Sequence, residues 1–124
     1  MERPRTLAFV CEHGALKSRL AAAYFNLAAP TRWRAVSAGV HPQENVSVHA
    51  ARLLAGTAAA TLLDTGPPRP VPLDDVADVV AIDCEFPGAR VWRLAAEEPC
   101  DAMRAEILAL VEELIVDLGE RRLT

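Results

Sequence analysis

The stretch TLAFVCEHGALKS, residues 6–18, runs from an apolar segment through a short loop into the start of a helix. Thr6–Val10 is an apolar run that is typical of a buried strand. Beyond the loop, apolar side chains recur at helical spacing from Leu16 to Leu27. Ligands of open α/β sheets bind outside the carboxyl ends of strands. The segment Cys11–Ser18 is therefore the predicted ligand-binding loop.

The residue types in this loop favour an anionic ligand and a reactive thiol. A loop of this length can turn successive backbone N–H groups inward, and the N-terminus of the following helix adds partial positive charge. Both effects favour the thiolate of a cysteine at the mouth of the loop, which is the position of Cys11. Gly14 allows a left-handed backbone, and Ser18 can donate a hydrogen bond to the thiolate. The alternative is that Cys11 is a buried structural cysteine.

The rest of the chain alternates between expected strands and helices. Further strands are expected at Trp33–Ser37, Asp78–Ile82 and Val91–Leu94. Asn45 or Ser47 can cap a second helix that ends near Gly56. The segment Asp64–Pro72 is rich in proline and is expected to be a surface loop. An apolar stripe from Met103 to Leu118 predicts a long final helix with Gly119 at its end. This alternation predicts a single α/β domain over residues 1–124, with a parallel sheet covered on both faces by helices.

Composition excludes several classes of protein. Apolar residues make up 52% of the sequence, which suffices for a packed core. The formal net charge is −4, which argues against nucleic acid or an anionic membrane as the main partner. No apolar run is long enough for a signal peptide or a membrane span, so a cytoplasmic location is expected. Three cysteines without a Cys/His cluster favour free thiols over a disulfide framework or a metal site.

The loop resembles the C-x5-R-S phosphate loop of the low-molecular-weight protein tyrosine phosphatase superfamily, which includes the thioredoxin-coupled arsenate reductases. Cys11, the five-residue spacer, Ser18 and Ala21 fall where that family has them. Weaker matches follow in the family's order: Ser37–Gly39, Leu63-Asp64, Asp78–Asp83 and Glu98-Pro99, with reductase-like features at His13, Trp92 and Arg104–Ile107. The resemblance covers nearly the whole chain and implies a four-stranded sheet in the order 2-1-3-4.

The resemblance also implies an oxyanion-handling cysteine enzyme that needs no metal. Cys11 attacks phosphorus or arsenic, Ser18 stabilises its thiolate, and Glu98 or Asp101 protonates the leaving group. The oxyanion is held by the loop residues Glu12, His13, Gly14, Ala15, Leu16 and Lys17. The substrate is phosphate, arsenate or a phosphoprotein. A reductase also requires a second thiol, for which Cys84 is the candidate, and thioredoxin or another thiol donor.

Three departures from the family pattern matter and lead to an alternative function, and one of them is Glu98-Pro99, which stands where the family has Asp-Pro. Lys17 stands where the family has an arginine, and a lysine cannot pair two oxygens of the ligand at once. Gly14 stands where the family has an asparagine that braces the loop. The alternative is a catalytically weak or inactive relative that binds phosphate, arsenate or a phosphorylated partner without turnover. The structural interpretations of the remaining candidates are a core residue for Cys84, a helix cap for Asp101 and an exposed side chain for Glu98.

Overall fold

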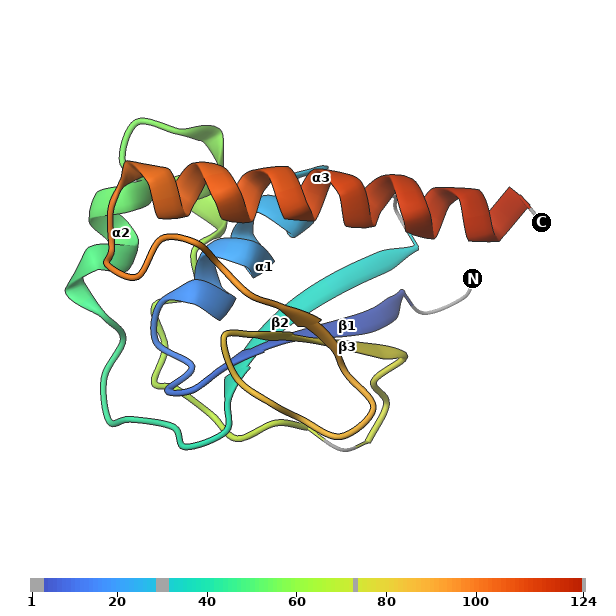
Figure 1. The fold of residues 1–124 in the computed structure, drawn as a ribbon, viewed down its shortest axis with the longest axis horizontal. Coiled ribbons are helices and arrows are strands. Elements are labelled where there is room, and N and C mark those ends of the chain that lie inside the picture. Colours follow the sequence, from blue (N-terminus) through green and yellow to red (C-terminus); the bar gives the residue numbers. More distant parts are fainter. Residues whose placement is uncertain (1–3, 29–31, 73, 124) are drawn as a thin grey trace.

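The computed structural model describes residues 4–28, 32–72 and 74–123 (Figure 1). Strands and helical segments alternate along the chain up to β3, as the sequence predicts, and β3 is then followed directly by β4. The strands are β1 (Arg5–Cys11), β2 (Trp33–Gly39), β3 (Asp78–Ile82) and β4 (Arg90–Trp92). The helices are α1 (Lys17–Ala28), α2 (Val48–Leu54), the short 3-10 helix η1 (Ala58–Leu62) and α3 (Asp101–Leu123).

The four strands form one parallel sheet in the order β2-β1-β3-β4, which confirms the expected fold class and strand order. β1 lies between β2 and β3, so that Val10 is opposite Ala38 on one side and Ala81 on the other. Leu7, together with the rest of β1 up to Val10, is completely buried, as expected for an apolar strand in the centre of a parallel sheet. Cys11, the last residue of β1, is thereby placed at the carboxyl edge of the sheet.

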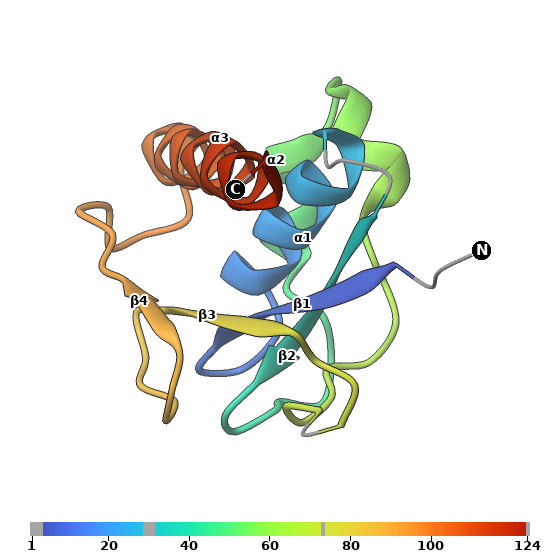
Figure 2. The same cartoon turned by 90° about the vertical axis from the view of Figure 1, so that its right-hand side faces the viewer.

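Helices cover one face of the sheet, and loops cover the other (Figure 2). On the first face, Phe9 packs with residues of α1 and α3 in the larger apolar cluster. On the second face, Ala8 and Val10 pack with apolar residues of the connecting segments, among them Val71 and Phe86. The expectation of helices on both faces is therefore wrong. The chain before β3 is rich in proline, which breaks helices, so it covers this face as an extended loop.

The ends of three elements differ from or refine the sequence predictions. Ser47 is the N-cap of α2, where its side chain accepts a hydrogen bond from the N–H of His49. β4 covers Arg90–Trp92, so it ends two residues before Leu94. α3 continues through Gly119 and does not end there. One glycine costs a helix only about 1 kcal/mol, which the flanking helix-forming residues offset. Within the described residues, no helix combines the length and apolar character needed to cross a membrane.

Replacing Ile107 by alanine should destabilise the protein by about 2–5 kcal/mol, because the side chain is completely buried in the larger apolar cluster. The neighbouring Leu108 is 36% exposed, and Leu108→Ala should cost about 1 kcal/mol or less. Urea unfolding of the two variants provides the measurement. Equal losses of stability would contradict the assignment of the buried face of α3.

Candidate active site

Cys11 is held at the end of β1 with its side chain on a cavity of about 270 Å³. Its Sγ donates a hydrogen bond to the Oγ of Ser18 over 3.2 Å. Ser18 is completely buried in the first turn of α1, so its hydroxyl has a fixed position. The strand and the helix thus place a thiol and a hydroxyl together, although seven residues separate them in the sequence.

The backbone of the loop is fixed through its carbonyl groups, each of which, from Cys11 to Leu16, accepts a hydrogen bond. The N–H groups of Val40, His41 and Gln43 donate to the carbonyls of Cys11, Glu12 and His13, in that order. The Nε of Arg19 donates to the carbonyl of Gly14, and the N–H of Ser47 donates to that of Ala15. The carbonyl of Leu16 accepts from the N–H groups of Arg19 and Leu20. In a trans peptide the C=O and the following N–H point in opposite directions. The N–H groups of residues 12–17 therefore point away from these donors, and successive N–H groups on one side of a loop are suited to bind an anion.

Two glycines allow the loop to approach the end of β2. Gly14 has a φ of +65°, and a Cβ at this position would lie 2.7 Å from the backbone nitrogen of Gly39. A Cβ on Gly39 would in turn lie 2.5 Å from the backbone nitrogen of Gly14. The two backbones are therefore in direct contact. An asparagine does not fit at position 14 in this arrangement, so the bracing of the loop comes from other residues.

Three charged side chains that line the cavity, those of Lys17, Asp83 and Glu12, have polar partners. The Nζ of Lys17 lies 2.7 Å from Oδ2 of Asp83, and each of the two side chains is 24% exposed. The other carboxylate oxygen of Asp83 accepts a hydrogen bond from the N–H of Leu94. Glu12 also lines the cavity, and its Oε1 is 2.7 Å from Nδ1 of His41. An anion that enters the cavity therefore competes with Asp83 for the lysine.

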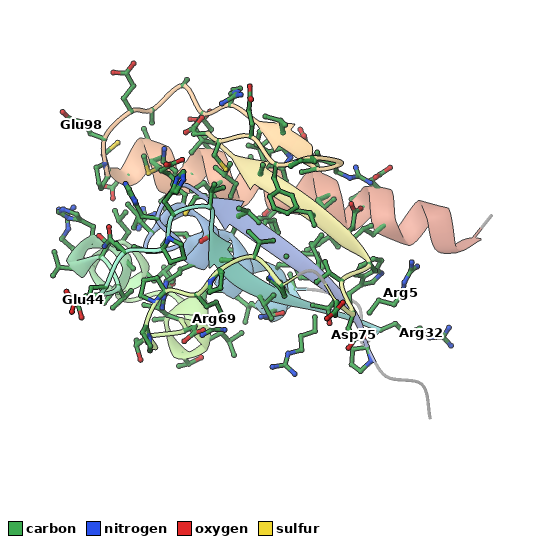
Figure 3. The ribbon with its side chains drawn as sticks, turned by 90° about the horizontal axis from the view of Figure 1, so that it is seen from below. Arg5, Arg32, Glu44, Arg69, Asp75 and Glu98 are labelled. Atoms are coloured by element: carbon green, nitrogen blue, oxygen red, sulfur yellow. The ribbon has the colours of Figure 1, made fainter. Side chains whose placement is uncertain are left out.

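All predicted loop residues except Gly14 line the cavity: Glu12, His13, Ala15, Leu16 and Lys17. The predicted proton donors lie elsewhere. Glu98 is exposed on the segment before α3 and projects outward (Figure 3). Asp101 is the first residue of α3, where its side chain is 86% exposed and 3.6 Å from a guanidinium nitrogen of Arg104. Among the described residues, the carboxylates that line the cavity are Glu12 and Asp83.

Cys84 is buried beside β1, on the face of the sheet that loops cover. Its Sγ donates to the carbonyl of Val10 over 3.5 Å, which places the thiol next to the backbone that leads into Cys11. Burial raises the pKa of the Cys84 thiol, and negative charge on the nearby Cys11 sulfur would act in the same direction. Cys100 is exposed at the start of α3.

Solved structures share this fold over nearly the whole chain. The arsenate reductase from Archaeoglobus fulgidus DSM 4304 is 31% identical, with a TM-score of 0.68, and the match covers 88% of this chain and 98% of that one. The chain belongs to the superfamily of low-molecular-weight protein tyrosine phosphatases and arsenate reductases. No family model and no curated protein sequence matches the chain.

Two other members of the superfamily show how widely the fold is used. The thioredoxin-dependent arsenate reductase Cg_ArsC1' from Corynebacterium glutamicum is 20% identical with a TM-score of 0.76, over 97% of this chain and 64% of that one. The YwlE arginine phosphatase from Geobacillus stearothermophilus is also 20% identical, with a TM-score of 0.70, and the match covers 97% of this chain and 96% of that one. At this level of identity the likeness is one of fold.

Sequence reasoning missed two residues of the site. Asp83 lies in the strand motif of the superfamily, but its side chain was not among the expected site residues. It is directly at the carboxyl end of β3, and the expected strand order places that end beside Cys11, so topology could have found it. Arg19 faces away from Lys17, as helix geometry predicts, yet it contacts the loop from behind. No sequence signal indicated this contact.

We expect iodoacetamide to modify Cys11 faster than Cys84 at neutral pH. Both thiols are about equally buried, at 5% and 6% exposed, but Cys11 opens on the cavity, whereas the raised pKa of Cys84 leaves little reactive thiolate. Raising the pH should therefore accelerate modification of Cys84. Peptide mapping by mass spectrometry gives the rate at each thiol.

Inorganic phosphate should slow the modification of Cys11 alone, with exposed Cys100 as the internal control. Equal rates at Cys11 and Cys84, or protection of Cys84 by phosphate without protection of Cys11, would contradict this description of the cavity.

Proposed function

We propose that the protein is an oxyanion-handling cysteine enzyme in which Cys11 is the nucleophile. The observation that supports the proposal is the loop itself: its carbonyl groups from Cys11 to Leu16 all accept hydrogen bonds, so the N–H groups of the same peptides point away from these donors and would be available to an anion. Such a row stabilises the charge that develops on a transferred phosphoryl or arsenyl group. Ser18 would assist by stabilising the thiolate, and Lys17 would contribute a positive charge.

In the phosphatase reaction, the Cys11 sulfur forms a bond to phosphorus while the bond from phosphorus to the leaving oxygen breaks. Water then releases phosphate from the cysteine. The leaving oxygen needs a proton unless it is stable as an anion. Glu98 and Asp101 remain the proton donors that the resemblance implies, but neither lines the cavity. We therefore expect substrates with good leaving groups, such as aryl phosphates, to be preferred.

In the reductase reaction, the Cys11 sulfur forms a bond to arsenic in arsenate while one As–O bond breaks and its oxygen, once protonated, leaves as water. A second thiolate, from Cys84, then attacks the Cys11 sulfur, so that a disulfide forms and arsenic leaves with two more electrons, as arsenite. Thioredoxin or another dithiol would reduce the disulfide. The position of the Cys84 sulfur at the carbonyl of Val10 supports this role, and a cytoplasmic location would keep both thiols reduced between cycles.

A specific observation favours the second candidate function, in which the protein binds an oxyanion without turnover. Lys17 stands at the position of the family's arginine, and its amine is already paired with Asp83 at 2.7 Å. The cavity thus has less free positive charge than a phosphoryl transition state requires. A weak enzyme or a binding protein would tolerate this pairing better than an efficient phosphatase.

Hydrolysis of p-nitrophenyl phosphate and thioredoxin-coupled reduction of arsenate, measured side by side, test these functions. Cys11→Ser should abolish both activities, because serine lacks a reactive thiolate at neutral pH. Cys84→Ser should abolish only arsenate reduction, and Cys100→Ser should leave both intact. If the native protein shows neither activity but binds phosphate, the binding function holds. If it also fails to bind phosphate, the proposal is wrong.

Replacing Asp83 by asparagine should tighten phosphate binding by about twofold to fivefold. The substitution frees Lys17 from a partly exposed ion pair, and such pairs contribute about 1 kcal/mol or less. Asparagine tolerates the positive φ of 53° at this position and can still accept from the N–H of Leu94. Isothermal titration with inorganic phosphate gives the dissociation constant.

The matched control is Glu85→Gln, which removes the same charge from a side chain that is 90% exposed and outside the cavity. This variant should bind phosphate with nearly unchanged affinity. In a variant that already carries Lys17→Ala, Asp83→Asn should not increase the affinity for phosphate by a comparable factor. A similar gain in both backgrounds would show that the effect is one of general charge and not of competition for Lys17.

A further inference from the structure

Arg19 is the largest of the completely buried side chains, with only 1% of its surface exposed. It belongs to the first turn of α1 and points to the side of the loop opposite the cavity, which it does not line. A buried guanidinium is rare unless its charge and its donors have partners. The partners of Arg19 therefore indicate why an arginine is buried there.

The guanidinium of Arg19 bridges the binding loop and the segment before β3. Its Nε donates to the carbonyl of Gly14 over 2.8 Å, and a terminal nitrogen donates to the carbonyl of Asp64. The same nitrogen is 3.9 Å from the carboxylate of Asp64. Burial lowers the pKa of Arg19, whereas the Asp64 carboxylate opposes that shift. An arginine nevertheless stays charged in proteins, so the loop has a fixed cation behind it.

Asp64 is in turn held in its ionised form. Burial alone would raise its pKa, but the N–H of Gly66 and the guanidinium of Arg69 outweigh burial and hold the pKa below its usual value. The Arg69 side chain is 2.6 Å from Oδ2 of Asp64, and the Arg69 carbonyl accepts from the N–H of Gly39 over 3.0 Å. Gly39 contacts Gly14, so the chain of interactions returns to the loop where it began.

The bond from Arg19 to Gly14 differs from the others along the loop. Of the carbonyl groups from Cys11 to Leu16, that of Gly14 is the one for which a side chain supplies the donor. Glycine has the least restricted backbone of all residues, so the peptide that joins Gly14 to Ala15 needs an external constraint. With the Gly14 carbonyl held from behind, the N–H of Ala15 points to the opposite side.

We infer that Arg19 is a positioning residue that orients the Gly14–Ala15 peptide so that the N–H of Ala15 faces the bound oxyanion. The inference rests on the proposed function for the identity of the ligand, but the orientation of the peptide is a property of the free protein. Arg19 supplies from the helix the bracing that position 14, as a glycine, cannot supply from its own side chain.

The test compares Arg19→Lys with Arg104→Lys. Lysine keeps the charge but has one amine, which cannot serve both the Gly14 and the Asp64 carbonyls in the same geometry. Arg104 is the matched control, because its guanidinium also donates to a backbone carbonyl, that of Leu53, but away from the loop. Both variants should have a somewhat lower Tm, and the decrease measures how much each arginine contributes to the stability of the fold.

Two further measurements separate positioning from stability. In the free protein, NMR hydrogen exchange should show faster exchange at the amides of residues 12–17 in Arg19→Lys than in Arg104→Lys. In phosphate titrations, Arg19→Lys should bind about tenfold more weakly than the native protein, the effect of one lost hydrogen bond to a charged ligand. Arg104→Lys should bind phosphate with native affinity.

The results distinguish the positioning role of Arg19 from the proposed function of the protein. If Arg19→Lys lowers Tm but leaves loop exchange and phosphate affinity unchanged, Arg19 is only a structural residue and the inference is overturned. If the native protein binds no phosphate while Arg19→Lys still loosens the loop, the positioning role stands and the proposed function fails. If Arg19→Lys does not fold, Arg19→Gln, which keeps a donor without the charge, takes its place under the same criteria.

Discussion

The site depends on the direct contact between the backbones of Gly14 and Gly39. Neither position has room for a Cβ, and Gly14 adopts a φ of +65° that disfavours other residues. The contact lets the chain after β2 run alongside the loop, where Val40, His41 and Gln43 donate to its carbonyl groups. Once these carbonyls are engaged, the N–H group of each peptide points away from the donor that its carbonyl contacts. The electrostatic character of the site thus follows from a steric constraint on two residues without side chains.

Positive charge is distributed on both sides of the loop, and each cation is matched by a carboxylate. On the cavity side, Lys17 is paired with Asp83, and both are accessible to solvent and to a ligand. Behind the loop, Arg19 is buried against Asp64. The two pairs have different physical roles, because a partly exposed amine can exchange partners at little cost, whereas a buried guanidinium cannot leave its acceptors without a large desolvation penalty. The loop therefore combines a fixed cation with an exchangeable one.

Much of the fold could be predicted from the sequence, because apolar runs such as Thr6–Val10 and Asp78–Ile82 define central parallel strands. The place of the loop followed from the strand before it. The pairing of Lys17 with Asp83 joins residues 66 positions apart, which no local pattern records. The role of Arg19 could not be assigned from the sequence. Residues Ser18–Phe25 of α1 are all buried, so this part of the helix has no exposed polar face that would distinguish an arginine pointing inward. Gly119 gave a misleading signal, since a glycine ends a helix only when the following residues cannot continue it.

Four of the donors to the loop carbonyls, the N–H groups of Val40, His41, Gln43 and Ser47, come from beyond α1, with consequences for the order in which the protein folds. A nascent chain that has reached only α1 contains Cys11 and Ser18 but not the segment 40–47 that engages the loop carbonyls, nor Asp64. Such long-range contacts form late, since loop closure has to precede them. The local part of the site can therefore exist as a helix and a strand before the loop carbonyls are engaged. Conversely, a local opening that detaches residues 40–47 from the loop would release its carbonyl groups while α1 stays packed on the sheet and α3 on α1.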